Sequence, residues 1–169
     1  MVQSQKRGHQ LLRKAGLTIS LFALMGAQIW SVAADQAPSL VINEIAYRGT
    51  SASTADEWIE LFNASSGQID LRGWQVFINS TPISLTGSVA PYGFYLLERG
   101  DDQTIADITA DKIFASSLSD SGAILQLKDP SGQIIDQLSQ WHVDLANPPP
   151  GFSPRSSMER ITPFVGGDV

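Results

Sequence analysis

Three glutamates that lie within apolar segments are the residues of this chain best suited to do chemistry. Glu44, Glu57 and Glu60 sit in or beside runs of Ile, Leu, Val and Trp, and paired carboxylates could act as general acid and base or hold a metal ion. Catalytic pairs normally lie in a cleft lined with other polar groups, however, and buried carboxylates are usually hydrogen-bonded or paired. We therefore interpret the glutamates as structural, with Arg72 and Arg160 as candidate partners. On this interpretation, neutral substitutions at Glu60 or Arg160 should lower the melting temperature.

A group of aspartates and one histidine are the other polar candidates. Asp101, Asp102, Asp107 and Asp111 crowd one segment, but their spacing matches no EF-hand calcium loop. His142 is the only histidine beyond residue 34, and the chain offers it neither a Gly-x-Ser-x-Gly motif nor a cysteine. We therefore predict no catalytic residue, no metal site and no cofactor.

Three tryptophans could form a surface on which a ligand stacks. In β-sandwiches, tryptophan more often lies in or near the core, and Trp58 and Trp74 alternate with polar neighbours as core-facing residues do. Trp141 stands close to the proline-rich segment 147–151 (NPPPG). We expect Trp141 to be exposed, and it is the candidate binding surface.

The elements that must position these residues are short strands. Segments such as 57–63 (EWIELFN) and 123–128 (AILQLK) alternate two side-chain sets and are bounded by turn residues. Pro130 and Gly132 suit the hairpin turn that follows. About eight or nine such strands, with no helical segment to make crossovers, predict an all-β fold. The expected architecture is an antiparallel β-sandwich, with a closed barrel as the alternative.

The first 34 residues have the composition of an export signal. Residues 1–14 carry four Lys and Arg and no acid, and residues 15–34 are uncharged and end in small side chains. We predict a signal-peptide helix cleaved after Ala34, or alternatively after Ala33, and a single domain at 35–169. The alternative is an uncleaved N-terminal anchor, although the strongly apolar part is shorter than the roughly 20 residues that span a bilayer. With the signal cleaved, no membrane span remains.

The charge of the predicted mature part argues against binding to nucleic acid. Beyond residue 34 the chain has seven Lys and Arg against 17 Asp and Glu, which gives a net charge of −10. Such a domain repels phosphate backbones, so direct nucleic-acid binding is disfavoured. We expect a secreted, periplasmic or cell-surface protein whose partner is a protein or a cell-envelope component.

Five segments, taken in order, carry a family resemblance. They are 41–45 (VINEI), 56–63 (DEWIELFN), 69–74 (IDLRGW), 119–127 (SDSGAILQL) and 157–161 (SMERI). The ordered set resembles the lamin tail domain as it occurs in exported bacterial proteins. The resemblance implies an immunoglobulin-like β-sandwich that serves as a non-catalytic interaction or tethering module.

The same resemblance carries an alternative function and one departure. Bacterial members are often attached to exported hydrolases, so the chain could be the accessory domain of a nuclease or phosphoesterase whose catalytic part is not in this sequence. Relatives commonly continue past the Glu-Arg-Ile segment with a polar stretch containing Trp, whereas this chain has only eight residues after Ile161. We therefore expect either a short last edge or a domain truncated at its C-terminus.

Overall fold

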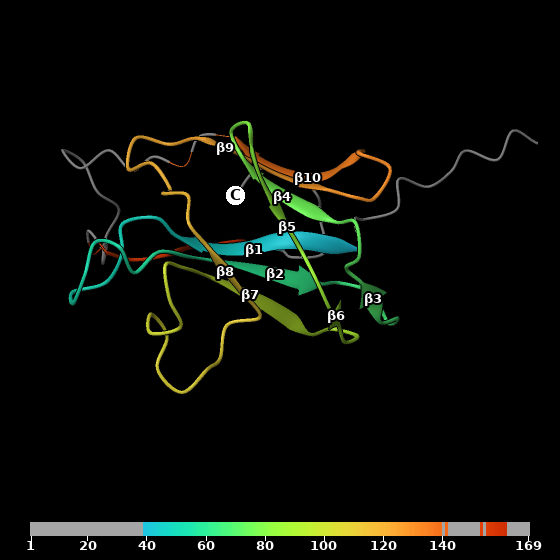
Figure 1. Ribbon diagram of the computed structural model, residues 1–169, viewed down its shortest axis with the longest axis horizontal. Coiled ribbons are helices and arrows are strands. Elements are labelled where there is room, and N and C mark those ends of the chain that lie inside the picture. The colour runs from blue at the N-terminus through green and yellow to red at the C-terminus, as the bar shows by residue number, and fades with distance from the viewer. Residues whose placement is uncertain (1–38, 140, 142–152, 154, 162–169) are drawn as a thin grey trace, which may run out of the picture. The chain divides into compact units, whose positions relative to one another are not determined.

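The computed structural model of the protein describes residues 39–139, 141, 153 and 155–161, which fold into eleven strands without a helix (Figure 1). Within these residues, nothing forms a helix long and apolar enough to cross a bilayer. The predicted signal-peptide helix lies outside the described residues. The strands are β1 (Leu40–Ala46), β2 (Trp58–Asn63), β3 (Ile69–Asp70), β4 (Gln75–Ile78), β5 (Thr81–Ser84), β6 (Ser88–Val89), β7 (Phe94–Arg99), β8 (Lys112–Phe114), β9 (Ile124–Lys128), β10 (Ile134–Ser139) and β11 (Met158–Glu159).

The strands form two larger sheets and one small one. Their orders are β11-β1-β2-β7-β8, β10-β9-β4-β5 and β3-β6. All of the described pairs are antiparallel except β7 with β8. The all-β prediction is confirmed, and the arrangement is consistent with an immunoglobulin-like sandwich. Eleven strands exceed the eight or nine expected, and strands β6 and β11, at two residues each, are too short to show an alternating pattern.

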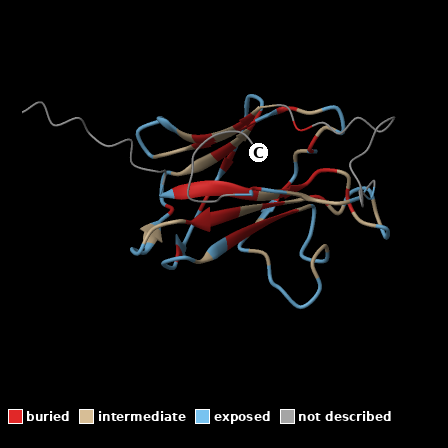
Figure 2. Cartoon of the chain, turned by 180° about the vertical axis from the view of Figure 1, so that it is seen from behind, coloured by how far each residue is buried: buried red, intermediate tan, exposed pale blue. Residues whose placement is uncertain are grey.

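A single hydrophobic cluster joins the two larger sheets. Ile59, Leu61 and Leu97 contribute from the first sheet, and Val76 and Leu125 contribute from the second; all five are fully buried. Figure 2 shows the buried residues concentrated on the strands and the exposed ones on the connections. With no cysteine available for a disulfide, this apolar burial is the main force that holds the sheets together.

A β-bulge in β1 explains an irregular sequence pattern. Leu40, Ile42 and Ile45 all belong to the core cluster, although strict alternation would bring residue 44 inward. The pairing of β1 with β2 shifts register between Ile42 and Glu44. The extra residue of the bulge moves the alternation by one position, so the next residue that faces the core is Ile45 instead of residue 44. Glu44 consequently faces away from the core.

Strand β2 turns Trp58 to the opposite face from the one predicted. Ile59 and Leu61 are the core residues of this strand, and Trp58, one position out of phase, stays partly exposed on the outer face beside Glu60. The expectation that Trp58 faces the core is therefore wrong: both residue sets of β2 contain apolar side chains, and the aliphatic set packs inside. Trp74 packs against the core cluster, as predicted.

Strand β5 forms one edge of the four-stranded sheet and contains a proline. Pro82 lies opposite Phe77 of β4. Since proline has no N–H to donate, it is tolerated in sheets mainly at edges. Its place in β5 is therefore compatible with the ladder to β4.

One end of the sandwich gathers segments that are distant in sequence. The β1–β2 connection meets the end of β7 through the Arg99 N–H, which donates to the Glu57 carbonyl at 2.9 Å. The segment between β8 and β9 and the segment before β11 join them through side-chain contacts described below. We call this surface the arginine end and define it as residues 48–57, Arg99, 117–120 and 155–157.

Candidate functional site

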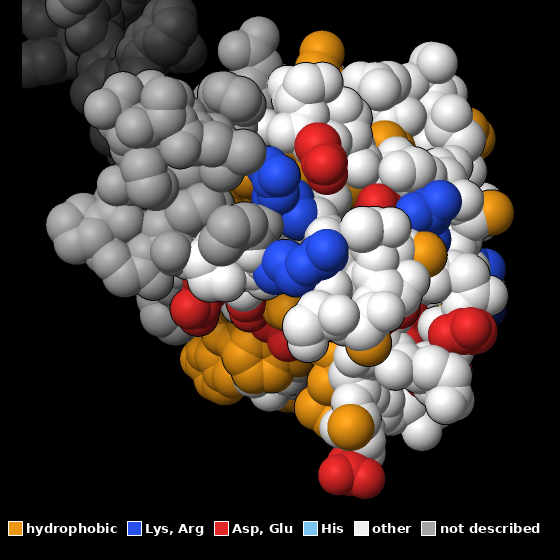
Figure 3. All heavy atoms as spheres, turned by 90° about the vertical axis from the view of Figure 1, so that its left-hand side faces the viewer, with side chains coloured by type: hydrophobic (Ala, Val, Ile, Leu, Met, Phe, Trp, Pro, Cys, Tyr) orange, Lys and Arg blue, Asp and Glu red, His pale blue; other side chains and the backbone are white. Residues whose placement is uncertain are grey.

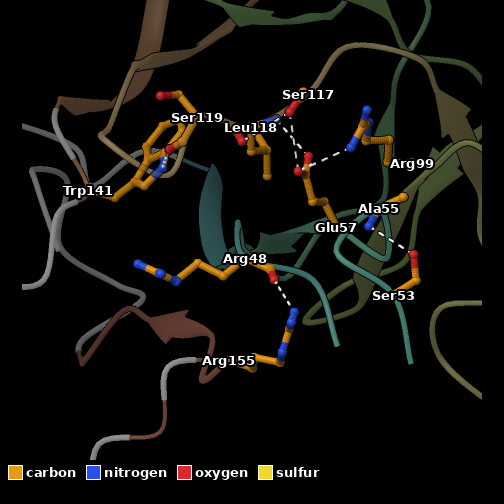
Figure 4. Close-up of polar contacts among 10 residues, drawn as sticks. All are labelled: Arg48, Ser53, Ala55, Glu57, Arg99, Ser117, Leu118, Ser119, Trp141 and Arg155. Atoms are coloured by element: carbon orange, nitrogen blue, oxygen red, sulfur yellow. Dashed lines mark hydrogen bonds and ion pairs between the residues drawn. The ribbon is translucent and has the colours of Figure 1, made fainter. Parts of the chain in front are cut away.

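Glu57 is the buried anchor of the arginine end. Only 3% of the residue is exposed. Its Oε2 accepts a hydrogen bond from the Leu118 backbone N–H at 2.6 Å, and its Oε1 accepts from Arg99 Nη1 and Ser117 Oγ, both at 3.2 Å (Figure 4). Burial raises the pKa of Glu57, while the Leu118 hydrogen bond and the charge of Arg99 act in the opposite direction. Glu57 thus ties the 117–120 segment to the end of β7 and is a structural group.

Trp141 is a core residue rather than a binding surface. It is 0% exposed, its ring centroid lies 6.2 Å from that of Tyr47, and its Nε1 donates to the Ser119 carbonyl at 2.8 Å. The expectation of an exposed Trp141 is therefore wrong. The 117–120 segment bonds to the indole, so this side chain instead fixes the position of that segment from the inside.

The β1–β2 connection is held in a tight and specific turn. Gly49 has a φ of +67°, and a Cβ at this position would lie 2.3 Å from the Ser53 carbonyl oxygen. Only glycine fits such a turn. The Thr50 N–H donates to the same carbonyl at 2.9 Å, and the Thr50 hydroxyl bonds to the Asp56 carboxylate. The loop that begins at Arg48 and carries Thr54 is therefore ordered by its own contacts.

Arg48 and Arg155 line a small open pocket at this end. Arg155 Nη1 donates to the Arg48 carbonyl at 2.8 Å, and Figure 4 shows the Arg48 side chain extending away from Glu57. The pocket has a volume of about 140 Å³, and its described walls are Arg48, Thr54, Asp120 and Arg155. Neither guanidinium forms an ion pair with a carboxylate among the described residues. Figure 3, which views this end of the domain, shows Lys and Arg side chains gathered near its centre.

A larger hollow lies at the β3–β6 sheet, and its described cation is already ion-paired. It has a volume of about 480 Å³ and is lined by Gln68, Asp70, Arg72, Gly87 and Ser88. Its only described cation, Arg72, donates to Asp70 at 2.5 Å. Hydrogen bonds from Arg72 lower the pKa of Asp70. Because this pair satisfies itself and both side chains are largely exposed, the hollow offers little unused binding capacity.

Arg160 is a structural residue, as predicted, but its carboxylate partner is one that the sequence did not indicate. It is 6% exposed, and its Nη2 lies 2.6 Å from Asp136 Oδ2. Its Nε donates to the Ile42 carbonyl at 2.9 Å, and the Ile42 N–H donates to Asp136 at 2.8 Å. The Arg160 backbone N–H bonds to the Asn43 carbonyl at 2.7 Å. This network joins β1, β10 and the residue after β11, and we call it the β1–β10 seam.

Glu44 and Glu60 lie side by side on the outer face of the first sheet. Glu44 is the register partner of both Glu60 and Glu159. The Glu44 carboxylate accepts a hydrogen bond from the Ser157 hydroxyl, and Glu60 Oε1 accepts from Asn43 Nδ2 at 2.8 Å. Burial, and to a smaller extent the charges of Glu44 and Glu159, raises the pKa of Glu60. The carboxylate partners shown for the two predicted arginines are others: Asp70 for Arg72 and Asp136 for Arg160.

Two of the four aspartates of the β7–β8 connection accept hydrogen bonds from the backbone. Asp102 Oδ1 accepts from the Ala110 N–H at 2.7 Å, and Asp111 Oδ2 accepts from the Leu96 N–H at 2.8 Å. The described residues contain no group of three or more His, Asp and Glu side chains that could hold a metal ion. His142 and the two candidate signal-cleavage residues, Ala33 and Ala34, lie outside the described residues.

The residues of the arginine pocket could not be found from local sequence patterns. Arg48 and Arg155 are 107 positions apart, and neither belongs to a recognisable motif. The fold is what brings the two side chains together.

Comparison of the sequence with known protein families gives a match. The family model of the lamin tail domain matches residues 33–142, which is more than half of the 169-residue chain. A comparison with curated proteins gives no significant match. The resemblance of the ordered motifs is thereby confirmed, and this chain belongs to the lamin tail domain family.

Proposed function

We propose that this chain is an exported, non-catalytic interaction module of the lamin-tail type, and that it binds its partner through the arginine end. The observation that carries the proposal is the pair Arg48 and Arg155, which line an open pocket without a carboxylate partner among the described residues. Two arginines without an ion pair among the described residues are unusual on a part of the chain with 17 acids and seven Lys and Arg. Ordered loops on a rigid scaffold are where binding surfaces are commonly found.

The export part of the proposal rests on the leader. A basic start, an uncharged apolar stretch and a small-residue ending support secretion and cleavage after Ala34 or Ala33. The partner is then a protein or a cell-envelope component. The test is to fractionate the native host and to sequence the N-terminus of the recovered protein by mass spectrometry. We expect an extracytoplasmic protein that begins at Asp35 or Ala34; an uncut protein in the cytoplasm contradicts export.

The interaction part is tested by site-specific photo-crosslinking in the same host. A photoreactive residue at the exposed position Thr54, on the arginine end, should capture a defined partner. A matched residue at Ser84, which is exposed on β5, should not. Equal capture at both positions, or none at Thr54, contradicts the proposed surface. Turnover of phosphoester or glycoside substrates by the purified chain, if lost on substitution of Glu44 or Glu60, contradicts the non-catalytic assignment.

A further inference from the structure

Two exposed aromatic residues lie at the end of the sandwich opposite the arginine end. Tyr92 and Phe94 are each 56% exposed. Phe94 is the first residue of β7, and Arg99, which belongs to the arginine end, is the last. Figure 1 shows β6, which precedes this turn, at the far end of the strands from the β1–β2 connection. The Cα atoms of Tyr92 and Phe94 are no more than about 7 Å apart, because only two peptide units separate them. We call this surface the aromatic end and define it as residues 90–94.

The backbone conformation of Tyr92 argues against a role for this side chain in the turn itself. The Gly93 N–H donates to the Ala90 carbonyl at 3.0 Å, so residues 90–93 form a turn. Pro91 occupies its second position, and Tyr92, with a φ of +54°, occupies its third. A positive φ at the third position favours Gly or Asn, and a bulky residue there is strained. A side chain that is exposed and strains its own turn contributes little to folding, which favours a role in binding.

The aromatic end is held in place by Asn63, the last residue of β2. Asn63 is 0% exposed. Its Nδ2 donates to the Ala90 carbonyl at 2.9 Å, and its backbone N–H donates to the Gly93 carbonyl, also at 2.9 Å. The Phe94 ring packs against Phe62, with 5.0 Å between the ring centroids. Because the turn is already ordered, it loses little conformational entropy when a partner binds.

The segments that form this end carry no charged residue, although the chain is strongly acidic. Residues 61–69 (LFNASSGQI) and 83–97 (ISLTGSVAPYGFYLL) contain no Lys, Arg, Asp or Glu. Beyond residue 34 the chain as a whole has a net charge of −10, so two copies repel each other in most orientations. Contact between two uncharged segments keeps the like charges furthest apart. The cores of protein interfaces are likewise depleted in charged residues and enriched in Tyr and Phe.

We propose that the aromatic end binds the aromatic end of a second copy of this chain, in a dimer with two-fold symmetry. The same surface then serves both copies, so the contact is complete after two molecules. It is made by side chains at one end of the sandwich and not by a sheet edge. Two aromatic residues per copy make a small interface, so we expect a weak dimer with a Kd on the order of 100 µM. The proposal goes beyond the arginine end, which lies at the other end of β7 and stays accessible in both copies.

The test is sedimentation velocity of the purified mature chain at concentrations below and above the expected Kd. We expect a reversible monomer–dimer equilibrium without larger species. Tyr92→Gly and Phe94→Ser should each weaken the dimer about fivefold, because each removes a half-exposed apolar side chain that the dimer buries. Ile108→Ser is the matched control, since Ile108 is also 56% exposed but lies on the β7–β8 connection, and it should dimerise like the parent. A parent that stays monomeric, or an equal loss in the control, overturns the proposal.

The Tyr92→Gly variant also separates binding from folding. Glycine adopts a positive φ without strain, so its melting temperature should equal or exceed that of the parent while its dimer is weaker. A lower melting temperature would assign Tyr92 to the fold and overturn its role in the contact.

Salt and lipid decide between the second copy and other occupants. Added NaCl should strengthen the dimer, because it screens the repulsion between two acidic copies and leaves apolar contacts in place. A dimer that salt weakens is held by charged groups, which overturns the proposal. Binding to zwitterionic phosphatidylcholine vesicles that Tyr92→Gly abolishes, without self-association of the parent, overturns the second copy as the occupant.

Discussion

The arginine side chain lies in opposite surroundings in two regions of the molecule. One region contains Arg160, and the other contains Arg48 and Arg155. In the β1–β10 seam, the guanidinium of Arg160 is buried and donates to the Asp136 carboxylate and the Ile42 carbonyl. At the arginine end, Arg48 and Arg155 line an open pocket, and the one hydrogen bond that the described residues give to their guanidinium groups is from Arg155 to the Arg48 carbonyl. A guanidinium whose donors are used by the protein can only hold the fold together. One whose donors remain available can bind a ligand.

The largest expected effect comes from breaking the seam. Arg160→Met leaves the buried Asp136 carboxylate without its guanidinium, and loss of one partner of a buried pair lowers the free energy of unfolding by about 3–5 kcal/mol. The measurement is urea unfolding at neutral pH. The double variant Asp136→Leu with Arg160→Met removes both charges and should recover much of the loss. A single variant as stable as the parent would show that the seam does not hold the sheets together.

Substitution of Glu57, the buried anchor of the arginine end, should give the next largest loss of stability. Glu57→Ala removes the acceptor of the buried Leu118 N–H and should destabilise the protein by about 2–3 kcal/mol. The change should also increase hydrogen exchange at Leu118 relative to the amides of β9. Unchanged protection of Leu118 would mean that the 117–120 segment is held by Trp141 alone.

The pocket arginines should contribute little to stability, in contrast to Arg160. Arg48→Gln and Arg155→Gln should each change the free energy of unfolding by no more than about 0.5 kcal/mol, since neither residue has an ion pair among the described residues. Thermal unfolding monitored by circular dichroism measures this. A loss comparable to that of Arg160→Met would make these residues structural and remove the contrast between the two regions.

The smallest effect is expected at Glu60, and it should depend on pH. Burial raises the pKa of Glu60 in the folded state above its value in the unfolded chain. The group therefore favours folding below its unfolded pKa, and that contribution is lost as the pH rises through the folded pKa. Glu60→Gln cannot titrate and keeps an acceptor for Asn43, so it should be more stable than the parent at neutral pH by a few tenths of a kcal/mol, given solvent screening. Melting temperatures at acidic and neutral pH test this; destabilisation at neutral pH would restore the expectation from sequence.

The fold could be predicted from sequence because its main strands are long enough to show alternation. The segment 57–63 and the hairpin of β9 and β10 appear where the pattern places them. The face of Trp58 could not be predicted, since both side-chain sets of β2 contain large apolar residues and only packing selects between them. The bulge at Ile42 and Glu44 likewise depends on the partner strand.

The candidate site was far less predictable than the fold. The structural role of Arg160 followed from the rule that charges are rarely buried alone, but its partner Asp136 lies on another sheet. Trp141 was misplaced because nothing near it in sequence shows that the Ser119 carbonyl would bond to its indole. Arg48 and Arg155 meet only through the fold, so no local spacing could have joined them.

Pro82 has a consequence for how the domain behaves in a crowded environment. An edge strand with free N–H groups can recruit a strand from another molecule and begin aggregation. Strand β5 is such an edge, but Pro82 interrupts its row of donors, so a second copy cannot extend the sheet there without losing a hydrogen bond. For a chain that has no disulfide to limit partial unfolding, this one residue helps to keep neighbouring copies separate.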